Sequence, residues 1–207
     1  MSSPRIIECQ TSFEKIVDEL YDPKKMGAMT IFPFLEYQIR QEARKEIARA
    51  KDKFTKGETT YKNAVQDLSY IDLSTKDTEL PITQEIWRAY NEWYQELAAV
   101  AKFPEPLDVN VATLLKYNVG SRGLSMHRDN SHYRNILASL IIEGDALFSV
   151  GRTRNDEHPM IIDPWPGEVI FMRAPRAPEE QDLRPYHSVG DVTNLRIALL
   201  LRQQKNQ

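Results

Sequence analysis

The sequence predicts an α+β fold in which N-terminal helices support a sandwich or jelly roll of short β-strands. Two observations lead to this prediction. Before residue 108, apolar side chains recur at helical spacing in three segments. From Asp108 onward, short apolar segments alternate with turn residues such as Gly144-Asp145 and Pro166-Gly167. This spacing is typical of all-β sandwiches and jelly rolls.

Length and composition indicate one ordinary globular domain. With 207 residues, the chain can build one good hydrophobic core and is short for two. We therefore expect a single domain, with helical support in residues 1–107 and the jelly roll in residues 108–207. Hydrophobic residues make up 41% of the chain and charged residues 28%, which excludes a disordered or fibrous protein.

Cysteine content and hydropathy bear on the compartment. A single cysteine, Cys9, rules out an intrachain disulfide, and neither a signal peptide nor an apolar run of membrane-spanning length is evident. We therefore expect a cytoplasmic protein without membrane contact. The net charge of −3 argues mildly against a nucleic-acid substrate, because it gives no strong positive field.

Each helix is predicted from its start signal and its apolar face. Thr11-Ser12-Phe13-Glu14 has the spacing of a capping box before an amphipathic helix that stops near Pro23. Residues 34–54 have one apolar face, and their many Lys and Arg side chains are interpreted as a solvated surface rather than a phosphate-binding one. Thr83 is expected to cap a third helix, whose aromatic stripe should pack on one face of the sheet.

The strands are predicted after residue 108, as short apolar or alternating segments bounded by turn residues. The eight predicted strands are residues 109–117, 124–128, 136–142, 146–150, 160–162, 168–172, 186–189 and 195–203. Residues 173–183, between the sixth and seventh strands, form a loop rich in proline and acidic residues.

The candidate metal ligands centre on the triplet His127-Arg128-Asp129. A histidine and an aspartate two residues apart on an extended backbone point to the same side, so both can reach one metal ion. His187 is the preferred third ligand, His132 is its rival, and His158 is assigned no role. Two histidines and one carboxylate leave open positions on a metal, as expected of non-haem Fe(II) oxygenases. The alternative for the triplet alone is an ordinary surface turn, with Arg128 at the surface or rim.

Two arginines follow on the last predicted strand. Arg196 and Arg202 share one face of it with Ala198 and Leu200. A charge on an inward face needs an anion, and a dicarboxylate cosubstrate would supply it, because an arginine fork matches carboxylate geometry. A structural salt bridge is the alternative for each arginine, and Asp129 is a candidate partner of Arg202.

Taken together, these residues resemble the AlkB-like branch of the Fe(II)/2-oxoglutarate dioxygenases. The matching parts are His127-x-Asp129, the later His187, Arg196 followed by Arg202, and Lys116-Tyr117-Asn118-Val119-Gly120. The resemblance covers roughly the second half of the chain. It departs from the family at Leu115 and Ala198, where AlkB-like repair enzymes usually carry asparagine, so two hydrogen-bonding groups near the cosubstrate are missing.

The resemblance implies a double-stranded β-helix core, Fe(II), and 2-oxoglutarate and O2 as cosubstrates. The implied ligands of Fe(II) are His127, Asp129 and His187. The distal carboxylate of 2-oxoglutarate is implied to lie at Arg196 and Tyr117, with Arg202 nearer the metal. In this superfamily, segments before the metal triplet commonly cover the substrate, so the polar residues 55–81 are expected to form either a lid or an ordinary connection.

The predicted function is oxidation of a substrate C–H bond, with release of succinate and CO2. A small polar metabolite, such as an amino acid or a related amine, is the preferred substrate, and Glu179, Glu180 and Asp182 would suit its cationic group. Demethylation of alkylated nucleic acid is the alternative within the family. A non-catalytic cupin-like module would have lost the ligand triad, and a zinc hydrolase would give no reason for the two arginines. The sequence does not specify an oligomeric state.

Overall fold

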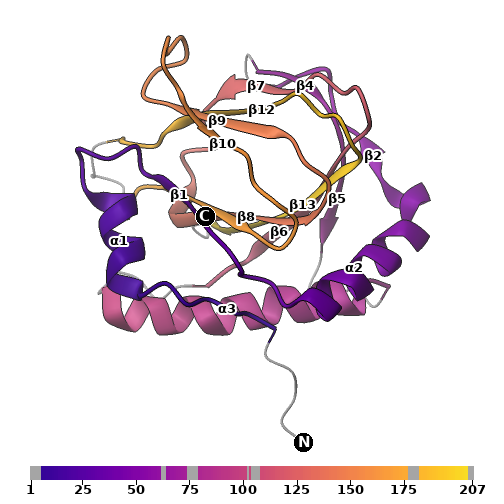
Figure 1. Cartoon of the computed structure of the whole chain (residues 1–207), viewed down its shortest axis with the longest axis horizontal. Helices are drawn as coiled ribbons and strands as arrows, with labels where there is room; N and C mark the ends of the chain where they lie inside the picture. The colour runs from indigo at the N-terminus through magenta and orange to yellow at the C-terminus, as the bar shows by residue number, and fades with distance from the viewer. Residues whose placement is uncertain are drawn as a thin grey trace, which may run out of the picture.

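The computed structural model describes residues 6–61, 64–73, 79–101, 103, 108–176 and 182–204. The described residues form two facing antiparallel sheets, and helices lie along the outer side of the larger sheet (Figure 1). The helices are α1 (Phe13–Tyr21), α2 (Tyr37–Arg49) and α3 (Pro81–Ala101), and the 3-10 helix Lys51–Lys53 follows α2. None of the described helices combines the length and the hydropathy needed to cross a bilayer.

From β6 to β13, successive strands alternate between the two sheets, except that β9 and β10 lie in the same one. Among the described residues, the larger sheet runs in the order β1 (Ala28–Ile31), β11 (Val169–Arg173), β8 (Tyr133–Glu143), β13 (Arg196–Gln204), β6 (Val111–Tyr117), β5 (Ser69–Leu73) and β2 (Thr55–Lys56). The smaller sheet runs in the order β10 (Met160–Ile162), β9 (Leu147–Gly151), β12 (Tyr186–Gly190), β7 (Gly123–His127), β4 (Ala64–Asp67) and β3 (Thr60–Tyr61). Two such sheets fit the predicted jelly-roll core.

All eight strands predicted after residue 108 are present, as β6 to β13. Their ends differ from the predicted ends by a few residues. The largest difference is at β8, which begins at Tyr133 rather than at residue 136. The hydrogen bonds of a strand continue into polar residues as long as a neighbouring strand is available, so hydrophobicity alone underestimates its length.

Two segments that were not predicted as strands extend the sheets. Residues 28–31 form β1 beside β11. Within residues 55–81, β5 pairs with β6 of the larger sheet and β4 pairs with β7 of the smaller one, so this segment crosses between the sheets. Short strands near a sheet edge carry polar side chains and give no clear alternation. Residues 62–63 and 74–78 of the predicted lid lie outside the described residues.

Side chains along β13 alternate between the helix layer and the space between the sheets. Those that belong to the core under the helices are Ile197, Leu199 and Leu201. Those that line the cavity between the sheets are Arg196, Ala198, Leu200 and Arg202. This alternation is the one predicted from the sequence, and it means that one strand serves both the hydrophobic core and the candidate site.

Aromatic side chains join the helices to the larger sheet. Trp93 of α3 stacks on Phe171 of β11, with ring centroids 5.5 Å apart and planes 3° from parallel. Phe34 meets both rings edge-on, at 5.1 Å from Trp93 and 5.5 Å from Phe171. The predicted aromatic stripe of α3 is therefore core, as expected, and it covers the outer face of the sheet.

The helices begin at different residues from those predicted. The N-cap of α1 is Ser12 rather than Thr11, and its hydroxyl accepts a hydrogen bond from the Lys15 amide at 3.3 Å. The helix predicted for residues 34–54 is shorter and spans Tyr37–Arg49, and before it the amides of Phe34 and Leu35 donate to the Gly167 carbonyl. Residue 83 lies inside the first turn of α3, so the prediction that Thr83 is its cap is wrong.

The start of α3 is capped by a side chain from another helix. The Glu46 carboxylate of α2 accepts hydrogen bonds from the Ile82 amide at 2.7 Å, the Thr83 amide at 2.9 Å and the Thr83 hydroxyl at 2.7 Å. Glu46 is only 9% exposed, so water replaces these bonds poorly. One carboxylate thus satisfies the free amides of α3 and fixes it against α2.

Replacing Glu46 with Ala should lower the free energy of unfolding by about 2–3 kcal/mol, because it leaves buried donors without an acceptor. Urea unfolding followed by circular dichroism measures the change. Glu42→Ala, an exposed position on the same helix, is the matched control and should shift stability by less than about 0.5 kcal/mol. Equal unfolding midpoints for the two variants would contradict the capping role.

Candidate metal centre

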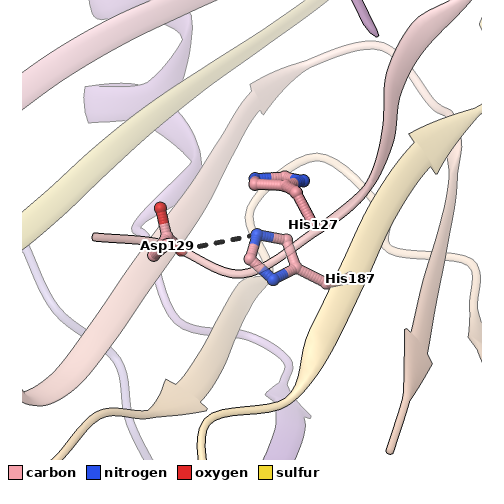
Figure 2. A group of neighbouring side chains, drawn as sticks. All are labelled: His127, Asp129 and His187. Atoms are coloured by element: carbon pink, nitrogen blue, oxygen red, sulfur yellow. Dashed lines mark ion pairs between the residues drawn. The ribbon is translucent and has the colours of Figure 1, made fainter. Parts of the chain in front are cut away.

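His127, Asp129 and His187 lie together between the sheets (Figure 2). His127 is the last residue of β7 and lies directly opposite His187 of β12 in the antiparallel pair. One ligand atom from each of the three side chains lies within 4.8 Å of the other two. The His187 Nε2 atom is 3.4 Å from Asp129 Oδ2, and the two imidazole centroids are 4.2 Å apart.

The position of Asp129 differs from the one expected. The strand predicted for residues 124–128 ends at His127, so Asp129 lies in the loop that follows rather than on an extended strand. The Asp129 carboxylate reaches the histidines from this loop, with its Oδ2 atom 3.4 Å from His187 Nε2.

The local electrostatics favour the protonation states that a metal ion requires. Burial first and the nearby His127 second lower the pKa of His187 to about 4, although Asp129 opposes the shift, so the imidazole is neutral at physiological pH. Burial alone would raise the pKa of the Asp129 carboxyl. His187, His127 and then Arg202 and Arg184 outweigh that effect and hold this pKa below its usual value. A neutral imidazole and an ionised carboxylate can bind a cation directly.

A backbone contact orients the first histidine. The His127 Nδ1 atom is 2.9 Å from the Ser125 carbonyl oxygen, which can only accept a hydrogen bond. The Nδ1 atom therefore carries the proton, and Nε2 keeps its lone pair for a ligand role. The second histidine, His187, stacks against the ring of Phe148, with ring centroids 5.5 Å apart.

Arg184 links the loop that carries Asp129 to the segment before His187, a role that was not predicted from the sequence. Its guanidinium donates to the backbone carbonyl of Asp129, and it donates twice to the Asp182 carboxylate, from Nε and from Nη2 at 2.7 Å each. Arg128 approaches the same carboxylate at 3.4 Å. The only sequence signal was its position three residues before His187.

The loop 173–183 was expected to offer acidic groups to a cationic substrate. Glu179 and Glu180 lie outside the described residues. Asp182 is already paired with Arg184 and approached by Arg128, so its charge is compensated within the protein. Asp182 therefore supports the metal loops rather than a substrate amine.

The other histidines are elsewhere. His132 is exposed, and its backbone amide donates to the Asn130 side chain in a turn. His158 is exposed in a turn organised by Asp156. Among the described residues, the group able to hold a metal contains neither of them.

A cavity of about 470 Å³ surrounds the three ligands. Arg196 lies at its wall, is only 1% exposed, and faces Tyr117 across the β13–β6 pair. Its Nη1 atom donates to the Ala146 carbonyl at 3.3 Å, while its Nε atom is buried without an acceptor. Among the described residues, no carboxylate lies within ion-pair distance of this guanidinium. The alternative prediction for Arg196, a structural salt bridge, is therefore not met among the described residues.

Tyr117, which faces Arg196, can donate a hydrogen bond from its hydroxyl at neutral pH. Burial raises the pKa of Tyr117 to about 12, although the Arg196 cation opposes the shift, so the phenol stays protonated. Burial also lowers the pKa of Arg196, yet a guanidinium remains charged. The pair therefore presents a cation and a hydroxyl donor to the cavity. Leu115 and Ala198 also line it, as expected from the two missing asparagines.

Arg202 lies at the other end of β13. Its Nη2 atom donates to the Thr113 hydroxyl at 2.6 Å, and its guanidinium lies 4.7 Å from the centroid of the Tyr133 ring. No ion pair joins Arg202 to Asp129 or to any other described residue, so the proposed Asp129 partner is not in contact. Arg128 lines the cavity and is partly exposed, which agrees with a rim position.

Comparisons with known proteins identify the fold. No protein-family model matches the sequence, and no curated protein matches it. A prolyl-4-hydroxylase from Pseudomonas putida has a TM-score of 0.70, with 14% identity over 94% of this chain and 100% of that one. A Trichoplax adhaerens prolyl hydroxylase, solved with a peptide fragment of hypoxia inducible factor, has a TM-score of 0.68, with 13% identity over 93% and 90%. An oxidoreductase of the 2OG-Fe(II) oxygenase family from Burkholderia pseudomallei has a TM-score of 0.62, with 13% identity over 100% and 97%.

The branch that the sequence resembles is also represented. The structure of OsALKBH1 has a TM-score of 0.58, with 14% identity over 86% of this chain and 98% of that one. At such identities these similarities establish a shared fold. The predicted resemblance to the Fe(II)/2-oxoglutarate dioxygenases is therefore confirmed at the level of the fold.

His187→Ala should reduce Co(II) affinity by more than about a hundredfold, because losing a ligand costs more than losing an outer partner of one. Calorimetric titration of the metal-free protein with Co(II) measures the affinity. His132→Ala is the control and should bind Co(II) as the unaltered chain does. The opposite pattern would move the third ligand to His132.

Arg184→Gln should weaken Co(II) binding about tenfold or more, because the Asp129 loop loses its anchor. Arg128→Gln removes a contact to the same Asp182 carboxylate but none to Asp129, so it should leave Co(II) affinity within about twofold. The Co(II) absorption bands should change in the first variant only. Identical affinities in both variants would rule out the anchoring role.

Proposed function

We propose that this protein is an Fe(II)- and 2-oxoglutarate-dependent dioxygenase that oxidises a C–H bond of a small polar molecule. One observation carries the proposal. A cluster of two histidines and an aspartate shares its cavity with a buried arginine that has no carboxylate partner among the described residues. The first feature suits a metal with open positions, and the second suits an anionic cosubstrate.

The ligand set fits Fe(II). His127, Asp129 and His187 supply two imidazoles and one carboxylate, the ligand types of the facial triad in non-haem iron oxygenases. Asp129 neutralises part of the metal charge, and Arg184 holds its loop. The role of these residues in the proposal is to hold the ion on one side and to leave its other side open.

The far wall of the cavity fits 2-oxoglutarate. Arg196 offers a guanidinium that a carboxylate can pair with, and Tyr117 adds a protonated hydroxyl beside it. The buried Nε atom of Arg196 lacks an acceptor, a state that a bound anion would relieve. Arg202 is proposed to act at the metal end of the same cavity. Leu115 and Ala198 keep the wall between these arginines apolar.

When bound, Fe(II) and 2-oxoglutarate would supply the chemistry by which O2 oxidises the substrate. The four electrons come from the C–H bond and from decarboxylation of the oxo acid. One oxygen atom enters succinate and the other enters the substrate, and CO2 leaves. The contribution of the protein is to position these groups within a cavity that both polar and apolar side chains line.

The competing functions account for fewer of these features. A zinc hydrolase would need the metal ligands but not Arg196 and its tyrosine partner. A non-catalytic module would need neither.

For a nucleic-acid substrate, the Lys and Arg side chains of α2 would be the main basic surface, and α2 packs on the outer face of the larger sheet, away from the cavity (Figure 1). The cavity volume of about 470 Å³ is that of a small-molecule site.

The test is succinate release from 2-oxoglutarate under air, with added Fe(II) and ascorbate. Turnover should appear without any added substrate, and Asp129→Ala should abolish it. An oxygen-dependent release that needs Fe(II) separates this proposal from a zinc enzyme and from a binding module. Complete inactivity of the iron-loaded protein would refute the proposed function.

Arg196→Leu should raise the KM for 2-oxoglutarate at least about tenfold, the loss expected for one charge-assisted pair. Tyr117→Phe removes only a hydroxyl and should raise it less. Arg88→Leu, exposed on α3, is the control and should leave this KM unchanged. An unaltered KM in the Arg196 variant would exclude this residue as the anchor.

A further inference from the structure

We propose that Arg173, the last residue of β11, is a positioning residue of the metal centre. It fixes the peptide group between Leu183 and Arg184, and Arg184 in turn holds the loop that carries Asp129. The inference rests on the metal site of the proposed function. Arg173 is not among the described residues that line the cavity, so it acts through Arg184 rather than on a ligand.

The Arg173 side chain lies against the backbone of the segment that leads into β1. Its own amide donates to the Gly27 carbonyl at 2.8 Å. Gly27 has a φ of +71°, and a Cβ atom at this position would lie 2.9 Å from the Nε and Cζ atoms of Arg173. A glycine is therefore needed for the guanidinium to lie where it does. Arg173 is also buried, so its direction is fixed by its surroundings.

The guanidinium binds one carbonyl oxygen with two donors. Arg173 Nε donates to the Leu183 carbonyl at 2.8 Å, and Nη2 donates to the same oxygen. The carbonyl of Leu183 and the amide of Arg184 belong to one planar peptide group. That amide donates to Asp182 Oδ1 at 3.2 Å. The peptide group is therefore held at both ends, and its orientation is fixed.

The chain after this peptide group is stiff. Arg184 precedes Pro185, which restricts the Arg184 backbone to extended conformations and has a fixed φ of its own. Two residues after Pro185, His187 enters the metal site from β12. The backbone between the fixed peptide group and the metal site therefore has little freedom to absorb a rotation of that group.

Arg184 transmits the constraint to the carboxylate ligand. Its Nη1 atom donates to the Asp129 carbonyl, and its side chain is largely buried. Metal sites tolerate errors of only about 0.2 Å in ligand distances, so a small shift of the Asp129 loop is enough to weaken binding. Arg173 lies on the larger sheet, whereas His127 and His187 lie on the smaller one. The path from Arg173 to Asp129 therefore links the two sheets at the metal centre.

The alternative role for Arg173 is support of the loop between β11 and β12 alone. Support alone predicts a lower stability and an unchanged affinity for metal. Positioning predicts a loss of metal affinity that depends on the presence of Arg184. A double variant that also lacks Arg184 separates the two roles.

The test is calorimetric titration of the metal-free full chain with Co(II), together with the Co(II) absorption bands. Arg173→Gln keeps a donor but loses the fork, so it should weaken Co(II) binding about tenfold and shift the bands. In the Arg184→Gln background, the same change should weaken binding by less than about twofold more, because the path is already broken. Glu46→Ala, which destabilises the helix layer, is the stability control and should leave Co(II) affinity unchanged.

Gly27→Ala tests the same contact without changing Arg173. The added Cβ should displace the guanidinium from Leu183 and weaken Co(II) binding about threefold or more. Gly120→Ala is the matched control, because Gly120 has a φ of +75° and no described atom lies within 4 Å of its Cβ position. It should keep Co(II) affinity within about twofold of the unaltered chain. Equal affinities in these two variants would count against the inference, and this pair decides the question if Arg173→Gln does not fold.

Two further results would overturn the inference and leave the metal site standing. One is an Arg173→Gln variant that binds Co(II) as the unaltered chain does, whatever its stability. The other is a double variant in which the losses from Arg173→Gln and Arg184→Gln multiply in full, since the two arginines would then act separately. Failure of the unaltered chain to bind Co(II) would instead remove the metal site of the proposed function, and the inference with it.

Discussion

The two-residue alternation of side chains along β13 separates hydrophobic core from candidate site. Its leucine and isoleucine side chains enter the core under the helices, and its two arginines enter the cavity. A shift of one residue in the pairing of β13 with β6 would bury the arginines under α3 and expose the leucines to the cavity. The register of this strand is therefore strongly determined by both faces at once. The aromatic packing of Trp93 on Phe171 and the Glu46 cap of α3 hold the helix layer against that register.

The candidate metal ligands depend on the opposite sheet. Pairing of β7 with β12 sets His127 against His187, and a loop rather than a strand adds Asp129. A loop is a less rigid support than a strand, and Arg184 compensates by linking the Asp129 backbone to the segment before His187. The site thus combines a rigid histidine pair with a carboxylate whose position depends on one arginine. Arg196 lies on the larger sheet and the two histidines on the smaller one, so the cavity between the proposed cosubstrate and metal sites is defined by how the sheets face each other.

The residues 64–73 connect these two supports. They leave β4 in the smaller sheet and enter β5 in the larger one, and Asp72 reaches Thr113 at the end of that path. Two prolyl hydroxylases and OsALKBH1, proteins with quite different names, share the fold of this chain at 13% and 14% sequence identity. A shared sheet framework with divergent lining residues fits the general separation of fold from function.

Much of the framework follows from the sequence alone. Strands such as β8 and β13 contain long apolar stretches. These stretches can be recognised in the sequence without knowing which strands they pair with. The order of His127, Asp129, His187 and Arg196 likewise predicts a metal and an anion before any geometry is known. The tertiary structure alone decided the rest. β1, β4 and β5 are stable because neighbouring strands accept their hydrogen bonds, Glu46 caps a helix that begins 35 residues later, and Arg184 meets a carbonyl 55 residues away. Such contacts depend on chain segments that folding brings together. In the sequence, the polar residues that make them look the same as polar residues that face water, so the contacts cannot be predicted from the local pattern.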